Sequence, residues 1–321
     1  MRPLQTAIGD ARRLLVSPDG NLNLVPFEAL IDAHGRYLIE HYAITYLTSG
    51  RDLLRMQVGR ASRSAPVIVA DPLFGAPAPA DGAARRSDSS GDDVSKRYFA
   101  PLAATAAEGR AIKRLFPEAT LLTGRDATKA AMQRAEAPRM LHIASHGFFL
   151  REATGRSSPL PTAPPNGVTP ATAATVPVEN PLLRSGLALA GANLTRDPNG
   201  DGILTALEAA GLNLWGTKLV TLSACDTGVG EVRNGEGVYG LRRAFVLAGA
   251  ETLVMSLWPV SDYMTREMMT AYYTGLRAGL GRGDALRHAK LAMLKRLGRQ
   301  HPFYWASFIQ SGEWADLDGR R

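Results

Sequence analysis

The sequence contains a single cysteine, Cys225, among 321 residues. One cysteine excludes a disulfide within the chain and fits a reducing compartment. The sequence also lacks any run of about 18 apolar residues, which argues against a transmembrane helix. The N-terminus has no apolar core of the kind that signal peptides carry. Together these absences predict a cytoplasmic protein that does not interact with membranes.

The positive charge of the chain is not concentrated anywhere. The formal net charge is +7, but the arginines are scattered and often stand beside acidic residues. No basic run has interleaved aromatics, so we interpret the charge as a solvated arginine-rich surface and predict no nucleic-acid partner. Hydrophobic residues make up 45% of the chain, enough for a sizeable core in one large α/β unit or two small domains.

Apolar runs rich in β-branched residues alternate with amphipathic segments along most of the chain. This alternation predicts an α/β fold with a mainly parallel, doubly wound sheet flanked by helices. The expected strands cover residues 42–47, 66–70, 120–123, 140–146, 186–190, 219–222, 251–258 and 303–309. The expected helices cover residues 106–116, 128–135, 203–210, 238–248, 263–276 and 284–297.

The N-terminal part of the chain has a different pattern. Residues 14–30 predict a β-hairpin, because Asp-Gly and Gly-Asn at Pro18–Asn21 are typical of turns. We therefore expect residues 1–64 to form an N-terminal hairpin and strand portion, and residues 65–321 to form the core. Low-complexity stretches near residues 75–97 and 152–180 predict two flexible loops.

Two of the predicted strands end in residues that carry chemistry. The strand at residues 219–222 continues to Cys225, and the strand at residues 140–146 ends at His146, before Gly147. Ligands bind at the carboxyl ends of strands in open parallel sheets. If the two strands are neighbours, about 4.8 Å apart, Cys225 and His146 face each other across one crevice. A thiol beside an imidazole is a candidate nucleophile beside a candidate base.

A second histidine, His142, stands four residues before His146 and inside the same strand. The period of two in strands places both side chains on one face. His142 is flanked by Leu141 and Ile143. We therefore interpret His142 as a packed, hydrogen-bonded core residue, and His146, before the flexible Gly147, as the base.

Several motifs in order along the chain resemble those of the CHAT proteases, which are relatives of caspases and separase. The resemblance begins near Ser17 and covers nearly the whole chain. The motifs are Leu141-His-Ile-Ala-Ser-His-Gly147, Val220-Thr-Leu-Ser-Ala-Cys-Asp-Thr-Gly228, Gly235-Glu-Gly-Val-Tyr-Gly-Leu-Arg-Arg-Ala-Phe245 and Leu257-Trp-Pro-Val-Ser-Asp262. This resemblance implies a caspase-like sheet and a cysteine endopeptidase that needs no cofactor for its chemistry.

The resemblance also implies roles for particular residues. The Cys225 thiolate would attack a peptide carbonyl and His146 would protonate the leaving amine. The backbone N–H groups of Gly147 and Cys225 would form the oxyanion hole. Two alternatives stay open, namely an inactive caspase-like scaffold or binding module, and another thiol acyl-transfer enzyme such as a ligase.

Asp262 matches an aspartate that, in separase-like enzymes, lines the pocket for the residue before the scissile bond. A carboxylate there favours Arg or Lys in the substrate, although Ser261 or Asp262 also suits the N-cap of the next helix. Asp226 is a weaker substrate-binding candidate. The family further implies a protein substrate, a role in bacterial defence or regulated cell death, and a helical-repeat sensor or regulator upstream.

One motif is independent of the resemblance. Residues 197–208 fit the EF-hand calcium-loop pattern, with oxygen ligands at alternate positions and a glutamate at the twelfth. Its candidate ligands are Asp197, Asn199, Asp201, the carbonyl of Ile203, and Glu208. The segment before the loop predicts a strand where an EF-hand has a helix, so a simple polar turn is the competing interpretation.

Overall fold

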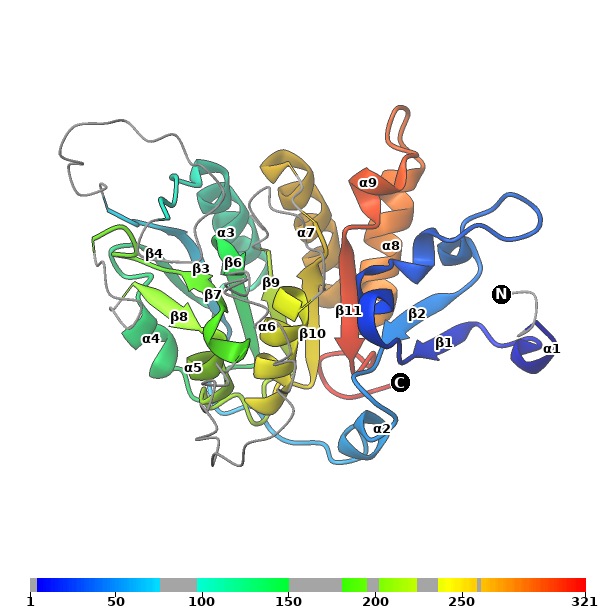
Figure 1. Cartoon of the computed structure of the whole chain (residues 1–321), viewed down its shortest axis with the longest axis horizontal. Helices are drawn as coiled ribbons and strands as arrows, with labels where there is room; N and C mark the ends of the chain where they lie inside the picture. The colour runs from blue at the N-terminus through cyan, green and yellow to red at the C-terminus, as the bar shows by residue number, and fades with distance from the viewer. Residues whose placement is uncertain (1–4, 76–96, 150–180, 195–201, 224–235, 259–260) are drawn as a thin grey trace, which may run out of the picture.

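The computed structural model describes residues 5–75, 97–149, 181–194, 202–223, 236–258 and 261–321. Within these ranges, eight strands form one sheet in the order β1-β2-β11-β10-β9-β5-β3-β4 (Figure 1). The strands of this sheet are β1 (Arg13–Val16), β2 (Ala43–Tyr46), β3 (Val67–Pro72), β4 (Thr120–Gly124), β5 (Met140–Ala144), β9 (Leu219–Leu222), β10 (Thr252–Ser256) and β11 (Phe308–Gly312).

The prediction of a mainly parallel sheet is confirmed. The strands β10, β9, β5, β3 and β4 are parallel to one another. The direction reverses once, at the antiparallel pair β10–β11, and β11, β2 and β1 are again mutually parallel. The central strands are buried on both faces, as their continuous Val, Ile and Leu runs require.

Helices cover both faces of the sheet (Figure 1). One apolar layer joins Met140 and Ala144 of β5 to α3, α7, α8 and α9, and the opposite layer joins Leu141 and Ile143 of β5 to α4, α5 and α6. The helices are α1 (Gln5–Ile8), α2 (Asp52–Arg55), α3 (Ala103–Leu115), α4 (Lys129–Gln133), α5 (Ala206–Ala210), α6 (Glu236–Leu247), α7 (Asp262–Arg277), α8 (Arg282–Leu294) and α9 (Pro302–Trp305).

The predicted N-terminal β-hairpin is wrong. After β1 the chain enters three short 3-10 helices, η2 (Gly20–Leu24), η3 (Phe27–Ala29) and η4 (Leu38–Glu40), and β1 pairs in parallel with β2. The side-chain amide of Asn23 donates to the carbonyls of Pro18 and Gly20, which stabilises the turn against an extended return strand. The division of the chain at residue 64 stays a prediction, although β1 and β2 complete the same sheet as β3.

Two further boundaries differ from the sequence prediction. The predicted helix at residues 203–210 begins only at Ala206, because Thr205 caps it and residues 203–205 form the strand β8 (Ile203–Thr205). The predicted strand at residues 303–309 begins at Phe308. Pro302 opens α9 before it, where His301 accepts a hydrogen bond from the Phe303 N–H.

A smaller sheet lies over the end of β5. It is antiparallel in the order β6-β7-β8, and it is made of β6 (Gly147–Phe149), β7 (Ser185–Ala188) and β8. A short 3-10 helix, η6 (Pro181–Leu183), precedes β7. Apolar residues of the smaller sheet form a third cluster with Phe74 and Phe99. The predicted flexible loops near residues 75–97 and 152–180 lie almost wholly outside the described residues.

Candidate active site at the ends of β5 and β9

The two strands that carry the predicted dyad are parallel neighbours, as expected. Ile143 of β5 is in register with Leu222 of β9, and the Ser223 N–H donates to the Ile143 carbonyl at 2.9 Å. His146 is the third residue after Ile143, and Cys225 is the third residue after Leu222. Cys225 lies outside the described residues, so its distance from His146 stays a prediction.

His146 lies in a cage of aromatic rings. Its side chain is buried with only 5% of the residue exposed. The imidazole centroid lies 5.2 Å from the ring of Phe74 and 5.8 Å from that of Phe99. Asn193 holds the backbone of both rings, because its N–H donates to the Phe74 carbonyl and its side chain makes hydrogen bonds with the N–H and carbonyl of Phe99. The aromatic cage therefore fixes the orientation of the imidazole.

A backbone carbonyl selects the tautomer of His146. Nε2 lies 2.7 Å from the carbonyl oxygen of Ala100. A carbonyl oxygen only accepts, so Nε2 carries the hydrogen and the lone pair of the neutral ring is on Nδ1. An imidazole held in this way by its second nitrogen is oriented to act as a base through Nδ1. A backbone carbonyl has no signature in the amino-acid sequence, so sequence analysis did not identify Ala100.

Gly147 begins β6, and its backbone N–H points away from β7. Gly147 is in register with Leu187, and the Ala188 N–H donates to the His146 carbonyl at 2.8 Å. This bond makes Gly147 and Leu187 a non-hydrogen-bonded pair of the antiparallel ladder, in which the N–H groups face outward. The orientation is the one that an oxyanion donor needs. The second predicted donor, the Cys225 N–H, is outside the described residues.

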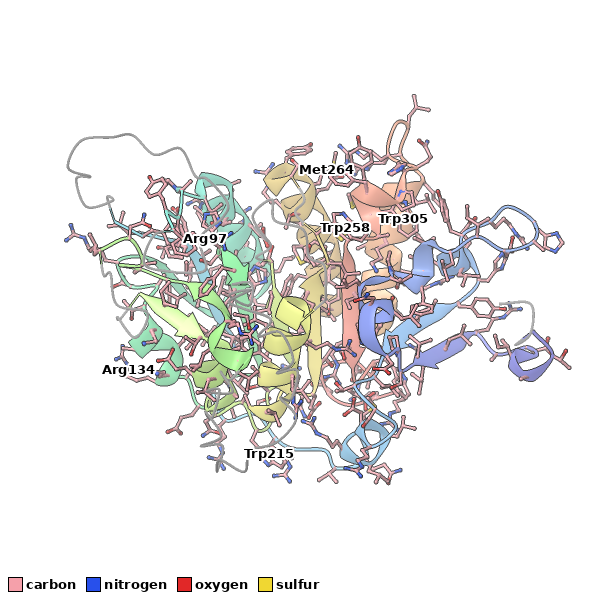
Figure 2. The ribbon with its side chains drawn as sticks, in the orientation of Figure 1. Arg97, Arg134, Trp215, Trp258, Met264 and Trp305 are labelled. Carbon is pink, nitrogen blue, oxygen red and sulfur yellow. The ribbon has the colours of Figure 1, made fainter. Side chains whose placement is uncertain are left out.

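The predicted pocket residue Asp262 is the first residue of α7, and Ser261 is its N-cap without a side-chain hydrogen bond. Trp258 anchors the segment before this helix, because its indole N–H donates to the Phe303 carbonyl at 3.2 Å. Figure 2 shows Trp258 between α7 and the start of β11. The Asp262 side chain and the whole of Asp226 lie outside the described residues, so their substrate contacts stay predictions.

Of the predicted calcium ligands, Asp197, Asn199 and Asp201 lie outside the described residues. The Glu208 carboxylate is in contact with the Lys129 ammonium at 2.9 Å and accepts from the N–H and hydroxyl of Thr205. Partial burial raises the pKa of Glu208, but the bonds from Lys129 and Thr205 outweigh it and hold the pKa below its ordinary value. Glu208 thus already has an ammonium partner, which a calcium ion would have to displace, and the calcium site stays a prediction.

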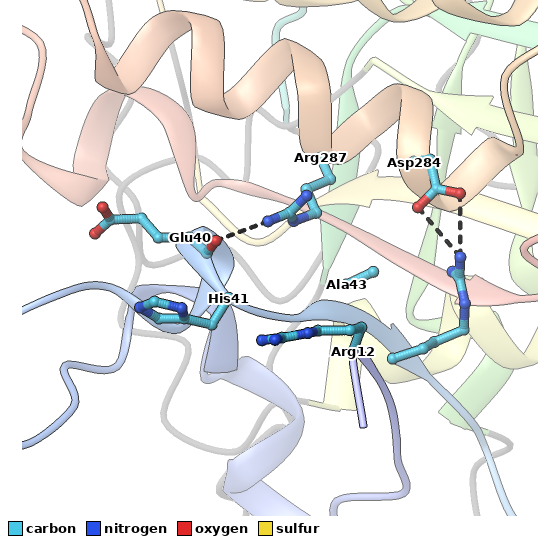
Figure 3. Close-up of a pocket in the computed structure, with 7 residues that line it drawn as sticks. Arg12, Glu40, His41, Ala43, Asp284 and Arg287 are labelled. Carbon is cyan, nitrogen blue, oxygen red and sulfur yellow. Dashed lines mark hydrogen bonds and ion pairs between the residues drawn. The ribbon is translucent and has the colours of Figure 1, made fainter. Parts of the chain in front are cut away.

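Two cavities in the described part of the chain lie away from the candidate dyad. One of about 430 Å³ is lined mainly by cationic side chains between β1, β2 and α8, including Arg12 and Arg287 (Figure 3). Three strands separate β2 from β5. The other cavity has a volume of about 1200 Å³ and is lined in part by Trp215 and Lys218, which precede β9. It therefore lies at the amino ends of the parallel strands, opposite the candidate site. Neither cavity belongs to the site at the carboxyl ends.

The fold and the polar strand ends define an open α/β protein whose candidate site lies at the carboxyl ends of parallel strands. The model of the CHAT domain matches residues 1–313, and the chain belongs to the CHAT-domain family, as the motifs predicted. No helix in the described ranges is long and apolar enough to cross a membrane.

The chain is similar to tetratricopeptide repeat protein 28 of Homo sapiens, with 34% identity over 116 residues, and to that of Mus musculus, with 33%. The match covers 36% of this chain and 5% of each relative, so this chain spans a small part of their length. A chain of the Saccharomyces cerevisiae separase–securin complex is similar with a TM-score of 0.48 and 11% identity. That similarity covers 91% of this chain and 14% of the other.

Proposed function

We propose that the protein is a cysteine endopeptidase that cleaves a protein substrate through a dyad of Cys225 and His146. The observation that carries the proposal is the orientation of His146. The imidazole is buried at the end of β5, beside the strand that leads to Cys225, and its Nε2 is held by the Ala100 carbonyl. Membership of the CHAT-domain family supports the same assignment.

In the proposed reaction, Nδ1 of His146 takes the proton of the Cys225 thiol, and the thiolate attacks the carbonyl carbon of the peptide bond. The negative charge on the carbonyl oxygen is stabilised by the N–H groups of Gly147 and Cys225. The imidazolium then gives its proton to the leaving amine, which leaves a thioester. A water molecule loses a proton to His146 and hydrolyses the thioester, which restores both residues.

Labelling of the thiol by a peptide acyloxymethyl ketone tests the proposal. The wild-type chain should be labelled at Cys225, as mass spectrometry of the digested protein would show, and Cys225→Ala should not be labelled. Equal labelling of both chains would contradict a reactive Cys225 and favour the inactive scaffold. Analysis of the products from a cleavable peptide, with and without an added amine, separates hydrolysis from ligation.

The proposed substrate preference depends on Asp262. With a carboxylate in the pocket, cleavage should follow Arg or Lys, since such charge-assisted bonds contribute about 1.5–3 kcal/mol. Profiling of a peptide library should show that preference in the wild type and a loss of about tenfold or more in Asp262→Asn. The neighbouring variant Ser261→Ala is the control and should keep it. A preference for acidic or large apolar residues, unchanged in Asp262→Asn, would exclude this role.

The proposed regulation follows from the relatives. Because the curated relatives are named for tetratricopeptide repeats, we propose that a helical-repeat protein or segment regulates this chain. The cellular setting that we propose is bacterial defence or regulated cell death in the cytoplasm. Identification of the protein termini that appear with wild type and not with Cys225→Ala would name the substrate.

A further inference from the structure

A buried chain of polar side chains joins the two strands of the proposed dyad. It comprises Glu108 of α3, His142 of β5, Tyr273 of α7 and Thr221 of β9, and we call it the polar chain. Each of the four residues is exposed by 2% or less. Buried polar groups cost stability unless they are paired, so their arrangement in an otherwise apolar layer calls for a reason.

The hydrogen bonds of the polar chain centre on the Tyr273 hydroxyl. His142 Nδ1 lies 3.0 Å from this hydroxyl, which donates to Oγ1 of Thr221 at 2.9 Å. Burial raises the pKa of Tyr273 well above its ordinary value, so the phenol keeps the hydrogen that it donates. The Tyr273 hydroxyl therefore links β5 to β9, because its oxygen takes part in one hydrogen bond with His142 and in another with Thr221.

Glu108 completes the polar chain from the other side of His142. Its Oε1 lies 3.0 Å from Nε2 of His142, at angles that fall outside those of a hydrogen bond. The next residue, Gly109, lets α3 come close to the sheet, because a Cβ built there would lie 2.8 Å from the Cβ of Ala70. The close packing of α3 thus brings a carboxylate to the buried imidazole.

The position of the polar chain along the strands relates it to the candidate site. His142 and Thr221 are register partners in the parallel pair β5–β9. His146 is four residues beyond His142, and Cys225 is four residues beyond Thr221. Tyr273 therefore bridges the two strands at one level, with an equal length of chain from each anchor to each member of the dyad.

We propose that the polar chain is a positioning device that sets the placement of His146 relative to Cys225. The proposal rests on the proposed function. Displacements of about 1 Å can cost about a hundredfold in rate when reacting groups must be aligned. The backbone ladder sets the register of β5 and β9, and the hydrogen bonds on the Tyr273 hydroxyl add a directed side-chain constraint from α7 at the same level. Tyr273 and Thr221 act here through the strands and do not touch the substrate.

The chain offers a matched control for Tyr273. The adjacent Tyr272 is also fully buried on α7, and its hydroxyl has no hydrogen-bond partner among the described residues. Both Tyr→Phe variants remove one buried oxygen from the same layer. Only Tyr273→Phe removes the link between β5 and β9.

The test measures labelling of Cys225 in the full chain by a peptide acyloxymethyl ketone, resolved into the binding constant of the probe and the maximal rate of inactivation. Tyr273→Phe should lower the maximal rate about tenfold or more, with a binding constant within about twofold, and Tyr272→Phe should leave both unchanged. Thr221→Val should act like Tyr273→Phe, and the double variant should be no slower than either. Thr221→Ser, which keeps the hydroxyl, should retain the wild-type rate.

Several outcomes would overturn the positioning role. If wild type is labelled and folded Tyr273→Phe or Thr221→Val reacts at the same rate, the polar chain is structural only. A drop in rate that is equal in Tyr272→Phe would also assign the effect to general packing. If Tyr273→Phe or Thr221→Val fails to fold, the rate of the remaining folded variant is compared with the rates of wild type and Thr221→Ser, and this comparison decides. Absence of label on wild-type Cys225 would instead refute the proposed function, and the positioning role with it.

Discussion

His146→Ala should slow labelling of Cys225 at pH 7 by about 10²- to 10⁴-fold, the range that a positioned general base contributes. The loss arises because the thiol then ionises only according to its own pKa, which is near 8.5 for an unassisted cysteine. The residual rate of the variant should therefore rise steeply between pH 7 and pH 9. The wild-type rate should already be high at pH 7. The measurement is the second-order labelling rate across this pH range.

His34→Ala is the control for this prediction, since His34 is exposed and its described hydrogen bond comes from its backbone N–H. It should label like wild type at every pH. A His146→Ala chain with the wild-type rate at pH 7 would remove His146 from the mechanism. A uniform drop with no recovery at high pH, together with a lower melting temperature, would indicate loss of structure in place of loss of a base.

Removal of one partner from the buried pair Lys290–Glu28 should have the largest effect on stability. Lys290 of α8 is fully buried, Glu28 of η3 is nearly so, and the two side chains are in direct contact. Glu28→Ala leaves an ammonium without its carboxylate inside the core. The free energy of unfolding should fall by about 3–5 kcal/mol, as measured by urea denaturation.

The matched control is an exposed pair of the same chain. Arg139 and Asp318 are in contact at 2.6 Å, but their side chains are 41% and 60% exposed. Asp318→Ala should cost less than about 1 kcal/mol, because water screens exposed pairs. Replacement of both buried partners, as Glu28→Leu with Lys290→Met, should recover most of the loss. A Glu28→Ala chain as stable as Asp318→Ala would contradict this account.

The sequence alone was sufficient to predict those strands and helices whose local residue pattern agrees with their place in the tertiary structure. Mainly apolar runs predicted the central strands β3, β5 and β9, because a strand buried on both faces is mostly apolar. Threonine is a residue type that favours the N-cap, and the side chain of Thr128 accepts a hydrogen bond from the Ala131 N–H of α4. The alternation of strands and helices predicted a parallel sheet, whereas the adjacency of β5 and β9 was a condition that the structure meets.

Local pattern failed where a particular side chain found a partner far away in the sequence. The Asp-Gly turn after β1 predicts a hairpin, yet Asn23 is buried against Arg242 of α6 and the return strand does not form. The carboxylate of Glu208 likewise has a partner that its local sequence does not indicate, Lys129 of α4, and the calcium site itself stays a prediction. No short window of sequence contains either pair, so no local signal for them exists.

The sequence by itself determined which residues carry the proposed chemistry, because only a few residue types act as nucleophile and base and Cys225 is the one thiol in the chain. Tertiary structure decided how His146 is held, through the Ala100 carbonyl and the rings of Phe74 and Phe99. It also placed Tyr273 between His142 and Thr221. The physical reason is that orientation depends on contacts between segments that are distant in sequence. A carbonyl or a core tyrosine has the same sequence signature whether or not it orients a catalytic side chain.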